Sequence, residues 1–281
     1  MIAFLDNALF SLTWPLPLIV IVLSMLVFAV AAYLARSLDL GGAAGAFVMG
    51  VVVLWSTGFG GFLLLLLFFV SSNIVGKISK KLRSRGQVAE ISEKKGHRRD
   101  LMQVLANGLM AVLAALMWLL SSKDIALVMF GAAVAEATAD TFAGEIGRLS
   151  SREPVSILTL RPVPRGLSGG VTLLGVFAAF AASAVIALCL YLWFPGVSVA
   201  GAVLAGTLGF AGSVIDSYLG AGVQAIYYDS EEKTFSEKEE KDGRKLELSR
   251  GIRWIDNDIV NLMSNVFSAV FALGMGMLVL K

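Results

Sequence analysis

Eight long apolar segments dominate this sequence and constrain its fold more than any other feature. A helix needs about 20 apolar residues to cross the hydrocarbon core of a bilayer, because it rises about 1.5 Å per residue. The chain has 281 residues, of which 57% are hydrophobic, and this composition is typical of polytopic membrane proteins. We therefore expect a single all-α domain over residues 1–281, a membrane bundle of about eight transmembrane helices. The segments cover residues 15–35, 41–57, 60–76, 101–120, 124–146, 169–194, 198–222 and 258–280.

The second and third segments are the weakest predictions of a span. Segment 41–57 is short, and its four glycines favour close packing of helices. Gly58, Gly60 and Gly61 indicate a turn before segment 60–76. We expect three N-terminal spans within residues 1–76, of which the last two are joined by this turn.

Basic residues are confined almost entirely to alternate stretches between the segments. Of the 23 Lys and Arg residues, 21 lie around Arg36 and at 77–99, 148–165 and 233–253. With eight spans all these stretches lie on one side of the membrane, which the positive-inside rule assigns to the cytoplasm. We therefore expect a basic cytoplasmic loop at 77–99, then a bundle over 100–281 with cytoplasmic loops at 148–168 and 225–255. Residues 229–247 are densely charged with both signs, and we interpret them as a solvated hairpin. The net charge of +2 gives no indication of nucleic-acid binding.

Three carboxylates lie at the end of the fifth segment, at Glu136, Asp140 and Glu145. A carboxylate at bilayer depth costs about 2.5–3.5 kcal/mol even on lenient insertion scales, so such residues are functional candidates by default. Glu136 and Asp140 are four residues apart and share a helix face. If the helix continues, Glu145 points about 140° away from Asp140. The fifth segment therefore predicts a polar site near its cytoplasmic end.

Two short matches indicate an internal repeat, in which each copy begins with an aspartate. The matched stretches are residues 100–107 with 258–265, and residues 140–144 with 216–220. The topology places Asp100, Asp140, Asp216 and Asp258 in the cytoplasmic leaflet, between the fourth, fifth, seventh and eighth segments. Clustered carboxylates repel one another, and a divalent cation offsets that repulsion. We expect Mg²⁺ with a nucleoside triphosphate, because few protein ligands together with phosphate oxygens suit the octahedral shell of this ion.

Two basic stretches that precede helices are candidate phosphate sites. Arg99 directly precedes the fourth segment, and helix N-termini with nearby arginines bind phosphates. Asp100, which follows it, is explained equally well as a helix cap. Before the sixth segment, Arg161 and Arg165 flank two prolines and lead into the glycine-rich run 166–170, whose backbone amides can turn toward an anion. The run is not a Walker A motif, and an ordinary turn before a span is the alternative.

Five motifs together resemble the phytyl-phosphate kinase family of integral membrane proteins, over residues 98–265. They are Arg99-Asp100-x-x-Gln103-Val-Leu-Ala-Asn107, Ala139-Asp140-Thr-Phe-Ala-Gly-Glu145-Ile-Gly147, Gly166-x-Ser168-Gly169-Gly170-Val-x-x-Leu-Gly175, Asp216-Ser-x-Leu-Gly-Ala-x-x-Gln224 and Asp256-Asn257-Asp258-x-Val-Asn261. The family is more distantly similar to phytol and dolichol kinases and to CDP-diacylglycerol synthases. The resemblance implies phosphoryl transfer from CTP, or another nucleotide, to a prenyl monophosphate such as phytyl or geranylgeranyl phosphate.

On this resemblance, carboxylates would bind the metal, while arginines, amides and the glycine-rich run would bind phosphates. The expected catalytic residues are Asp140, Asp216, Glu145 and Asp100. The expected metal ligands, or residues directly behind them, are Asp140, Asp216, Glu136 and Asp258. The expected nucleotide- and phosphate-binding residues are Arg99, Asn107, Arg161, Arg165, Gly166, Ser168, Gly169, Asn261 and Asn265. The prenyl chain would lie between helices and open to lipid, with its phosphate at the cytoplasmic boundary.

Two other functions fit the same features. A cytidylyltransferase would form a CDP-linked lipid from the same substrates, by attack on the α-phosphate instead of the γ-phosphate. A secondary transporter also uses intramembrane carboxylates and internal repeats, but its site is expected near the middle of the membrane. The acidic residues here adjoin basic, glycine-rich loops at one face, which favours an enzyme. The sequence leaves open which lipid and which nucleotide are used, and whether the chain forms a homodimer.

Overall fold

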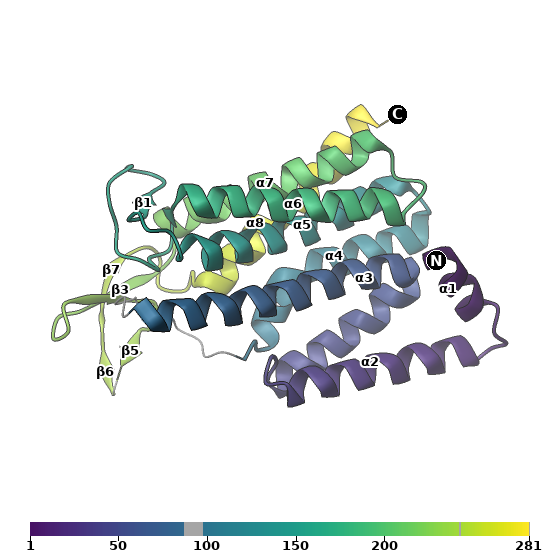
Figure 1. Cartoon of the computed structure of the whole chain (residues 1–281), viewed down its shortest axis with the longest axis horizontal. Coiled ribbons are helices and arrows are strands. Elements are labelled where there is room, and N and C mark those ends of the chain that lie inside the picture. Colours follow the sequence, from purple (N-terminus) through teal and green to yellow (C-terminus); the bar gives the residue numbers. More distant parts are fainter. Residues whose placement is uncertain (87–97, 242, 281) are drawn as a thin grey trace.

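The computed structural model describes residues 1–86, 98–241 and 243–280. Figure 1 shows a bundle of helices lying side by side, with both chain termini at one end and the strands at the other. Seven helices in the described part of the chain are long and apolar enough to cross a membrane, which confirms the predicted membrane bundle. The helices are α1 (Ile2–Phe10), α2 (Leu16–Leu34), α3 (Leu40–Gly86), α4 (Leu101–Ser121), α5 (Asp124–Gly147), α6 (Leu173–Trp193), α7 (Val199–Gly222) and α8 (Asn257–Val279).

Helix α3 consists of two arms, because its backbone leaves the helical conformation at Gly58 (φ 66°, ψ −162°). Figure 1 shows the arms running in opposite directions on either side of this bend. The expected segments 41–57 and 60–76 are therefore both helical and joined at the expected turn. The amide of Phe59 donates a hydrogen bond of 2.8 Å to the carboxylate of Asp6, so α1 caps the start of the second arm.

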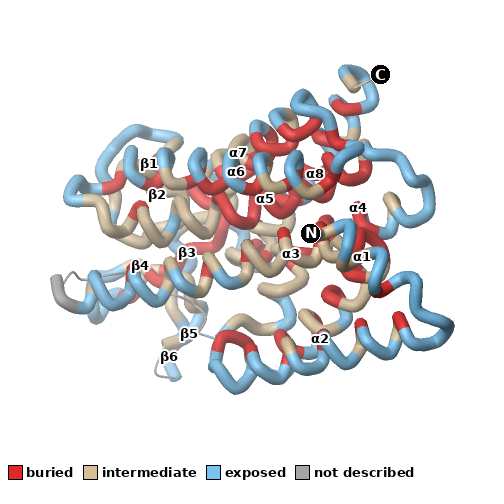
Figure 2. Tube along the Cα trace, turned by 45° about the vertical axis from the view of Figure 1, so that its right-hand side comes forward, coloured by how far each residue is buried: buried red, intermediate tan, exposed pale blue. Residues whose placement is uncertain are grey.

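Helix α5 is the centre of the bundle and packs against α3, α4, α6, α7 and α8. Figure 2 shows it largely buried, whereas α2 is exposed over much of its length. Small residues permit this packing: a side chain at Gly209 of α7 would collide with Ala135 of α5, and one at Gly131 of α5 would collide with Leu190 of α6. Because other helices enclose α5, its polar residues face protein instead of lipid, which is the usual setting of functional intramembrane carboxylates.

Short strands build the end of the bundle that lies away from the termini. β1 and β2 pair antiparallel within the loop between α5 and α6. Between α7 and α8, β3 pairs with both β4 and β7 in a three-stranded antiparallel sheet, and β5 and β6 form a separate hairpin. The bounds are β1 (Val155–Ser156), β2 (Gly170–Val171), β3 (Ile226–Asp229), β4 (Thr234–Ser236), β5 (Glu240–Lys241), β6 (Arg244–Lys245) and β7 (Glu247–Arg250).

The sequence predicted a loop over the whole basic stretch 77–99, and the structure corrects this prediction. Its first part continues α3 as far as Gly86. Lys and Arg are good helix formers, and no glycine or proline interrupts the run from Lys77 to Arg85. Residues 87–97 of the predicted loop lie outside the described residues.

Helix α6 begins later than residue 169, where the sixth apolar segment was predicted to start. Thr172 is its N-cap, and the Thr172 hydroxyl accepts a hydrogen bond of 3.1 Å from the amide of Gly175. The same hydroxyl lies 3.2 Å from the carbonyl oxygen of Gly147, so this cap also joins the start of α6 to the end of α5. The glycine-rich run is thereby left outside the helix.

Candidate functional site

A polar cavity of about 610 Å³ lies at the strand-containing end of the bundle. Its walls are the ends of α5 and α7, the starts of α4, α6 and α8, and the loop between α5 and α6. Eleven of the residues predicted for a site line it: Arg99, Asn107, Asp140, Glu145, Arg165, Gly166, Ser168, Gly169, Asp216, Asp258 and Asn261. Four others do not line it: Asp100, Glu136, Arg161 and Asn265. Helix ends that are far apart in the sequence thus meet at one cavity.

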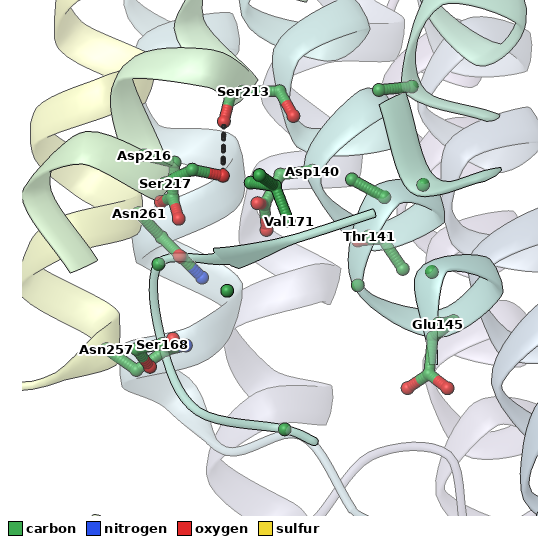
Figure 3. Close-up of a pocket in the computed structure, with 18 of the residues that line it drawn as sticks. Asp140, Thr141, Glu145, Ser168, Val171, Ser213, Asp216, Ser217, Asn257 and Asn261 are labelled. Atoms are coloured by element: carbon green, nitrogen blue, oxygen red, sulfur yellow. Dashed lines mark hydrogen bonds between the residues drawn. The ribbon is translucent and has the colours of Figure 1, made fainter. Parts of the chain in front are cut away.

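Asp140 of α5 and Asp216 of α7 face each other inside this cavity. Figure 3 shows the two residues next to each other, and their carboxyl groups lie within hydrogen-bonding reach. Asp140 lies about two turns before the end of α5 at Gly147, and Asp216 lies nearly two turns before the end of α7 at Gly222. Two carboxylates this close repel each other unless a proton or a cation lies between them. The pair is therefore a candidate cation site.

Asn261 of α8 contacts this aspartate pair. With its amide group oriented to donate, Nδ2 of Asn261 lies 3.0 Å from Oδ2 of Asp216 and 3.2 Å from the carbonyl oxygen of Asn257. Asp258, one turn earlier on α8, is buried and lines the same cavity. The contact places Asn261 where it orients the Asp216 carboxylate.

Glu136 lies beneath the cavity, where α5, α7 and α8 meet, and only 2% of its surface is exposed. Its carboxylate accepts hydrogen bonds of 2.7 Å from the Ser264 hydroxyl and 2.6 Å from Nδ2 of Asn265. The Ser264 hydroxyl also lies 3.2 Å from Oδ2 of Asp216, so a single side chain links the buried glutamate to the cavity pair. Both oxygens of Glu136 are thus hydrogen-bonded within the protein, and the residue supports the pair from below.

The cavity residues fit a metal ion that takes most of its ligands from a substrate. Within the described residues, no three or more His, Cys, Asp and Glu side chains are grouped to hold an ion by themselves. The four predicted metal ligands therefore do not form one ligand set. In nucleotide sites Mg²⁺ is usually held by one or two carboxylates, phosphate oxygens and waters. Asp140 and Asp216 match that smaller requirement.

Arg99 lines the cavity from the segment just before α4. Its backbone is fixed by hydrogen bonds of 3.0 Å to the carbonyl of Ser37 and 3.1 Å from the amide of Asp39. Its guanidinium lies over the ring of Phe68, 5.4 Å from the ring centroid, and no acceptor in the described part of the chain takes a hydrogen bond from it. Burial lowers the pKa of this guanidinium and the charge of Glu145 raises it, but an arginine remains charged. Arg99 thus offers its donors to an anion.

The other two predicted arginines differ in their position relative to the cavity. Arg165 lines the cavity, but its Nη1 donates to the carbonyl of Ser150 at 2.6 Å, and its Nη2 lies 3.3 Å from the carbonyl oxygens of Ser151 and Arg152. These contacts hold the chain that leaves α5. Arg161 is exposed and lies away from the cavity lining. The structure therefore brings Arg165, and not Arg161, to the site.

The glycine-rich run packs directly on the end of α7. Gly166 and Gly169 have φ angles of 81° and 80°, a conformation that favours glycine. A side chain at Gly169 would collide with the backbone of Ala221, so the two backbones are in direct contact. This contact places the run on the cavity wall beside the end of α7.

Two residues between α7 and α8 were not predicted for the site: Arg250 on β7, and Glu237 just after β4, which lies in the stretch 229–247 interpreted as a solvated hairpin. Nη2 of Arg250 donates to the carbonyl oxygens of Ser168 at 2.8 Å and Gly220 at 3.1 Å, and burial lowers the pKa of its guanidinium. Glu237 accepts hydrogen bonds of 2.6 Å from the Ser168 hydroxyl and 3.0 Å from Nε2 of Gln224. The sheet therefore holds the glycine-rich run against α7. The sequence predicted strands here, but it did not predict that they would contact the glycine-rich run and α7.

Two predicted catalytic residues have contacts away from the aspartate pair. Figure 3 shows Glu145 apart from that pair, and its Oε2 lies 3.4 Å from Nη2 of Arg83 on α3. Asp100 is the N-cap of α4: its carboxylate accepts from the amide of Gln103 at 2.9 Å, and the Gln103 side chain accepts from the Asp100 amide at 3.1 Å. Of the two interpretations open for Asp100, the structure shows the helix cap.

The fold and the site define a class of protein: a multi-pass integral membrane protein with a polar, carboxylate-containing cavity at one end of its helical bundle. Within that class, the chain belongs to the integral membrane protein family DUF92, whose profile matches residues 23–269. The match includes four of the five helices that line the cavity in full, and α8 as far as residue 269.

Three relatives are similar to the chain over most of its length. It is 34% identical to the uncharacterized membrane protein MJ0933 of Methanocaldococcus jannaschii over 205 residues, 73% of this chain and 82% of that protein. It is 30% identical to Protein PGR of Arabidopsis thaliana over 272 residues, 87% of this chain and 90% of that protein. Its identity to Protein VTE6, chloroplastic, of the same plant is 25% over 256 residues, 88% of this chain and 68% of that protein. No solved structure matches the chain. The family and these relatives confirm the resemblance to the phytyl-phosphate kinase family.

Proposed function

We propose that this chain transfers the γ-phosphoryl group of a nucleoside triphosphate, CTP being the expected donor, to a prenyl monophosphate such as phytyl or geranylgeranyl phosphate. The product would be the prenyl diphosphate. The observation that carries this proposal is that Asp140 and Asp216 face each other in a cavity of about 610 Å³ that also contains Arg99 and the glycine-rich run. The relation to the phytyl-phosphate kinase family supports the choice of acceptor.

In the proposed reaction the protein itself forms no covalent bond to either substrate and needs no strong general base. The acceptor phosphate is already anionic at neutral pH, so one of its oxygens attacks the γ-phosphorus without a strong general base. A bond forms between that oxygen and the γ-phosphorus, while the bond from the γ-phosphorus to the β–γ bridging oxygen breaks. CDP leaves with the electron pair of the broken bond. Catalysis then depends on positioning the two substrates and neutralising their charge.

The residues of the cavity supply those two effects. A magnesium ion held by Asp140 and Asp216 would neutralise charge on the nucleotide phosphates. Asn261 keeps Asp216 oriented through its hydrogen bond of 3.0 Å. Arg99 donates to phosphate oxygens from the α4 side of the cavity, and charge-assisted bonds of this kind are the stronger ones. Arg250 fixes the backbone of the glycine-rich run at the cavity edge.

The cavity is proposed to open to the cytoplasm. Figure 1 shows the strands, and with them the loop after α5 and the loop before α8, at the end of the bundle opposite the termini. The basic stretches of the sequence lie at that end, which the positive-inside rule assigns to the cytoplasm. A soluble nucleotide would enter from this end, while the prenyl chain would reach the cavity from the surrounding lipid.

Purified protein with magnesium, CTP labelled at the α- or the γ-phosphate, and geranylgeranyl monophosphate tests the proposal. The expected products are CDP and geranylgeranyl diphosphate that carries the γ-label. Pyrophosphate release with a lipid that carries the α-label would identify a cytidylyltransferase instead. No turnover with any nucleotide, together with solute flux in liposomes, would reject the enzyme in favour of a transporter.

A further inference from the structure

A second, apolar pocket lies between α2, both arms of α3, and α4, and has a volume of about 90 Å³. We call it the side pocket. Its apolar lining includes Met25 of α2, Ala46 and Met49 of the first arm of α3, Leu65 and Phe69 of the second arm, and Val104 of α4. None of these residues belongs to the polar cavity.

The side pocket adjoins the polar cavity through a shared wall. Arg99, Gln103 and Asn107 line both spaces. Gln103 and Asn107 lie one turn apart on α4, and Nδ2 of Asn107 donates to the carbonyl of Gln103 at 2.9 Å. The side pocket extends along α4 to Gly108, nine residues beyond Arg99, which corresponds to a depth of roughly 13 Å along the helix. It therefore runs from the level of the polar cavity toward the middle of the bundle.

A positive charge stands at the junction of the two spaces. The Arg99 guanidinium lies against Phe68, which is itself part of the side pocket lining. Its donors are not taken by acceptors of the described chain, so an anion bound at this point would satisfy them. An anionic group followed by a short apolar chain matches the junction in both charge and polarity.

We infer that the side pocket holds the part of the lipid chain next to the phosphate, about one isoprene unit, while Arg99 binds the phosphate. This inference rests on the proposed function. The volume sets the length of chain: an apolar cavity of roughly 150 Å³ binds the six carbons of benzene, so about 90 Å³ holds at most one five-carbon unit. The remaining units would leave the pocket between the helices for the lipid.

The pocket would act on orientation more than on affinity. Lipid hydrocarbon is as apolar as the pocket lining, so moving an isoprene unit from lipid to pocket brings little hydrophobic gain. A fixed first unit, however, fixes the direction of the phosphate oxygens toward the nucleotide. Orientation of this kind raises the rate of reaction. The prenyl substrate should therefore lose kcat/KM when the pocket is filled, while the nucleotide keeps its KM.

The substitution Ala46→Phe tests this by filling the side pocket with an aromatic ring. Ala44→Phe is the matched control, because Ala44 lies on the same arm of α3 and is exposed outside the pocket. For Ala46→Phe we expect kcat/KM for geranylgeranyl monophosphate to fall about tenfold or more, with the KM for CTP unchanged. For Ala44→Phe we expect wild-type values of both.

Photolabelling of the wild-type protein gives a second readout that does not depend on the folding of a variant. A prenyl monophosphate with a diazirine on its first isoprene unit should label peptides that contain Met25, Met49 or Leu65. Labelling near Val176 of α6 or Phe210 of α7 would reject the side pocket while leaving the proposed function in place, as would an unchanged kcat/KM in folded Ala46→Phe. Absence of both turnover and labelling would instead reject the proposed function itself.

Discussion

Asn265 of α8 donates a hydrogen bond of 2.6 Å to the buried carboxylate of Glu136 on α5. Asn265 is itself completely buried, and its Nδ2 also donates to the carbonyl oxygen of Ala133 at 2.8 Å, so both amide hydrogens are bonded. The contact joins the central helix to the last helix directly beneath the cavity. Through Ser264 it continues to Asp216, so the position of a cavity carboxylate depends on a buried polar network.

Glu136→Ala should destabilise the protein, whereas Glu136→Gln should not. Alanine leaves an amide hydrogen of Asn265 without its acceptor, and an unsatisfied buried group costs about 1–3 kcal/mol. Glutamine keeps both contacts, because its oxygen accepts from Asn265 while its amide donates to the Ser264 hydroxyl. Melting temperatures in detergent should therefore fall for alanine and stay near wild type for glutamine, with activity retained in the latter. A folded but inactive Glu136→Gln protein would contradict this supporting role and restore Glu136 as a metal ligand.

Asp140→Asn and Asp216→Asn should each abolish phosphoryl transfer without unfolding the protein. Asparagine keeps the size of aspartate but removes the charge that a metal-bound nucleotide requires, and loss of one such electrostatic contact typically costs about 100-fold or more in kcat. Asp124→Asn is the control, because Asp124 is exposed at the opposite end of α5. Turnover and melting temperature should be measured for all three variants. Activity in Asp140→Asn would remove Asp140 from the proposed metal site.

Local signals in the sequence were sufficient to predict the membrane-spanning segments and the meeting of two helix ends. Apolar length located the helical segments, and the glycines at 58, 60 and 61 located the bend in α3. The convergence of Asp140 and Asp216 followed from topology alone, because alternating spans return the ends of α5 and α7 to one side. Each of these inferences depends on residues close together in the sequence or on a count of spans.

Roles that depend on tertiary contacts were not predictable in the same way. The repeat aligns Asp100 with Asp258, yet the N-cap of α8 is Asp256, whose carboxylate accepts from the amides of Asp258 and Ile259 at 3.1 and 3.2 Å. The N-cap of α8 is therefore two residues before the position that the repeat aligns with Asp100, the N-cap of α4. Arg250 reaches a carbonyl 82 residues away, a contact that no local pattern reveals.

Arg250→Ala should weaken nucleotide binding although Arg250 does not line the cavity. Its Nη2 makes two charge-assisted hydrogen bonds, to Ser168 and Gly220, and each such bond contributes about 1.5–3 kcal/mol. Without them the glycine-rich run is no longer fixed, and a loss of about 1.4 kcal/mol already raises the KM for the nucleotide tenfold. Arg250→Lys should recover part of the effect. The control is Arg253→Ala, because the Arg253 side chain is 68% exposed. A fall in kcat with unchanged KM would contradict a positioning role.

The orientation of the bundle predicts which loops a membrane-impermeant thiol reagent reaches. Cys189 is the single cysteine of the chain, so Cys189→Ala gives a background for one introduced cysteine. We expect Lys123→Cys, between α4 and α5, to be labelled in intact cells. Glu153→Cys, in the loop after α5, should be labelled only after permeabilisation, because the basic stretches lie at its end of the bundle. The reverse pattern would place the cavity on the outer face.

Gly58→Ala should destabilise the N-terminal part of the bundle by two separate effects. At φ 66° and ψ −162° the backbone lies in a region that is essentially restricted to glycine, and a side chain there costs on the order of 1–3 kcal/mol. The added methyl group would also collide with the Asp6 carboxylate and break its bond to Phe59. Asp6→Ala removes only the cap, which costs about 1 kcal/mol, so it should lower the melting temperature less. Gly274→Ala is the control, because Gly274 is helical and a methyl group there meets nothing within 4 Å. If Gly58→Ala melted no lower than Gly274→Ala, the reversal of α3 at Gly58 would have to be abandoned.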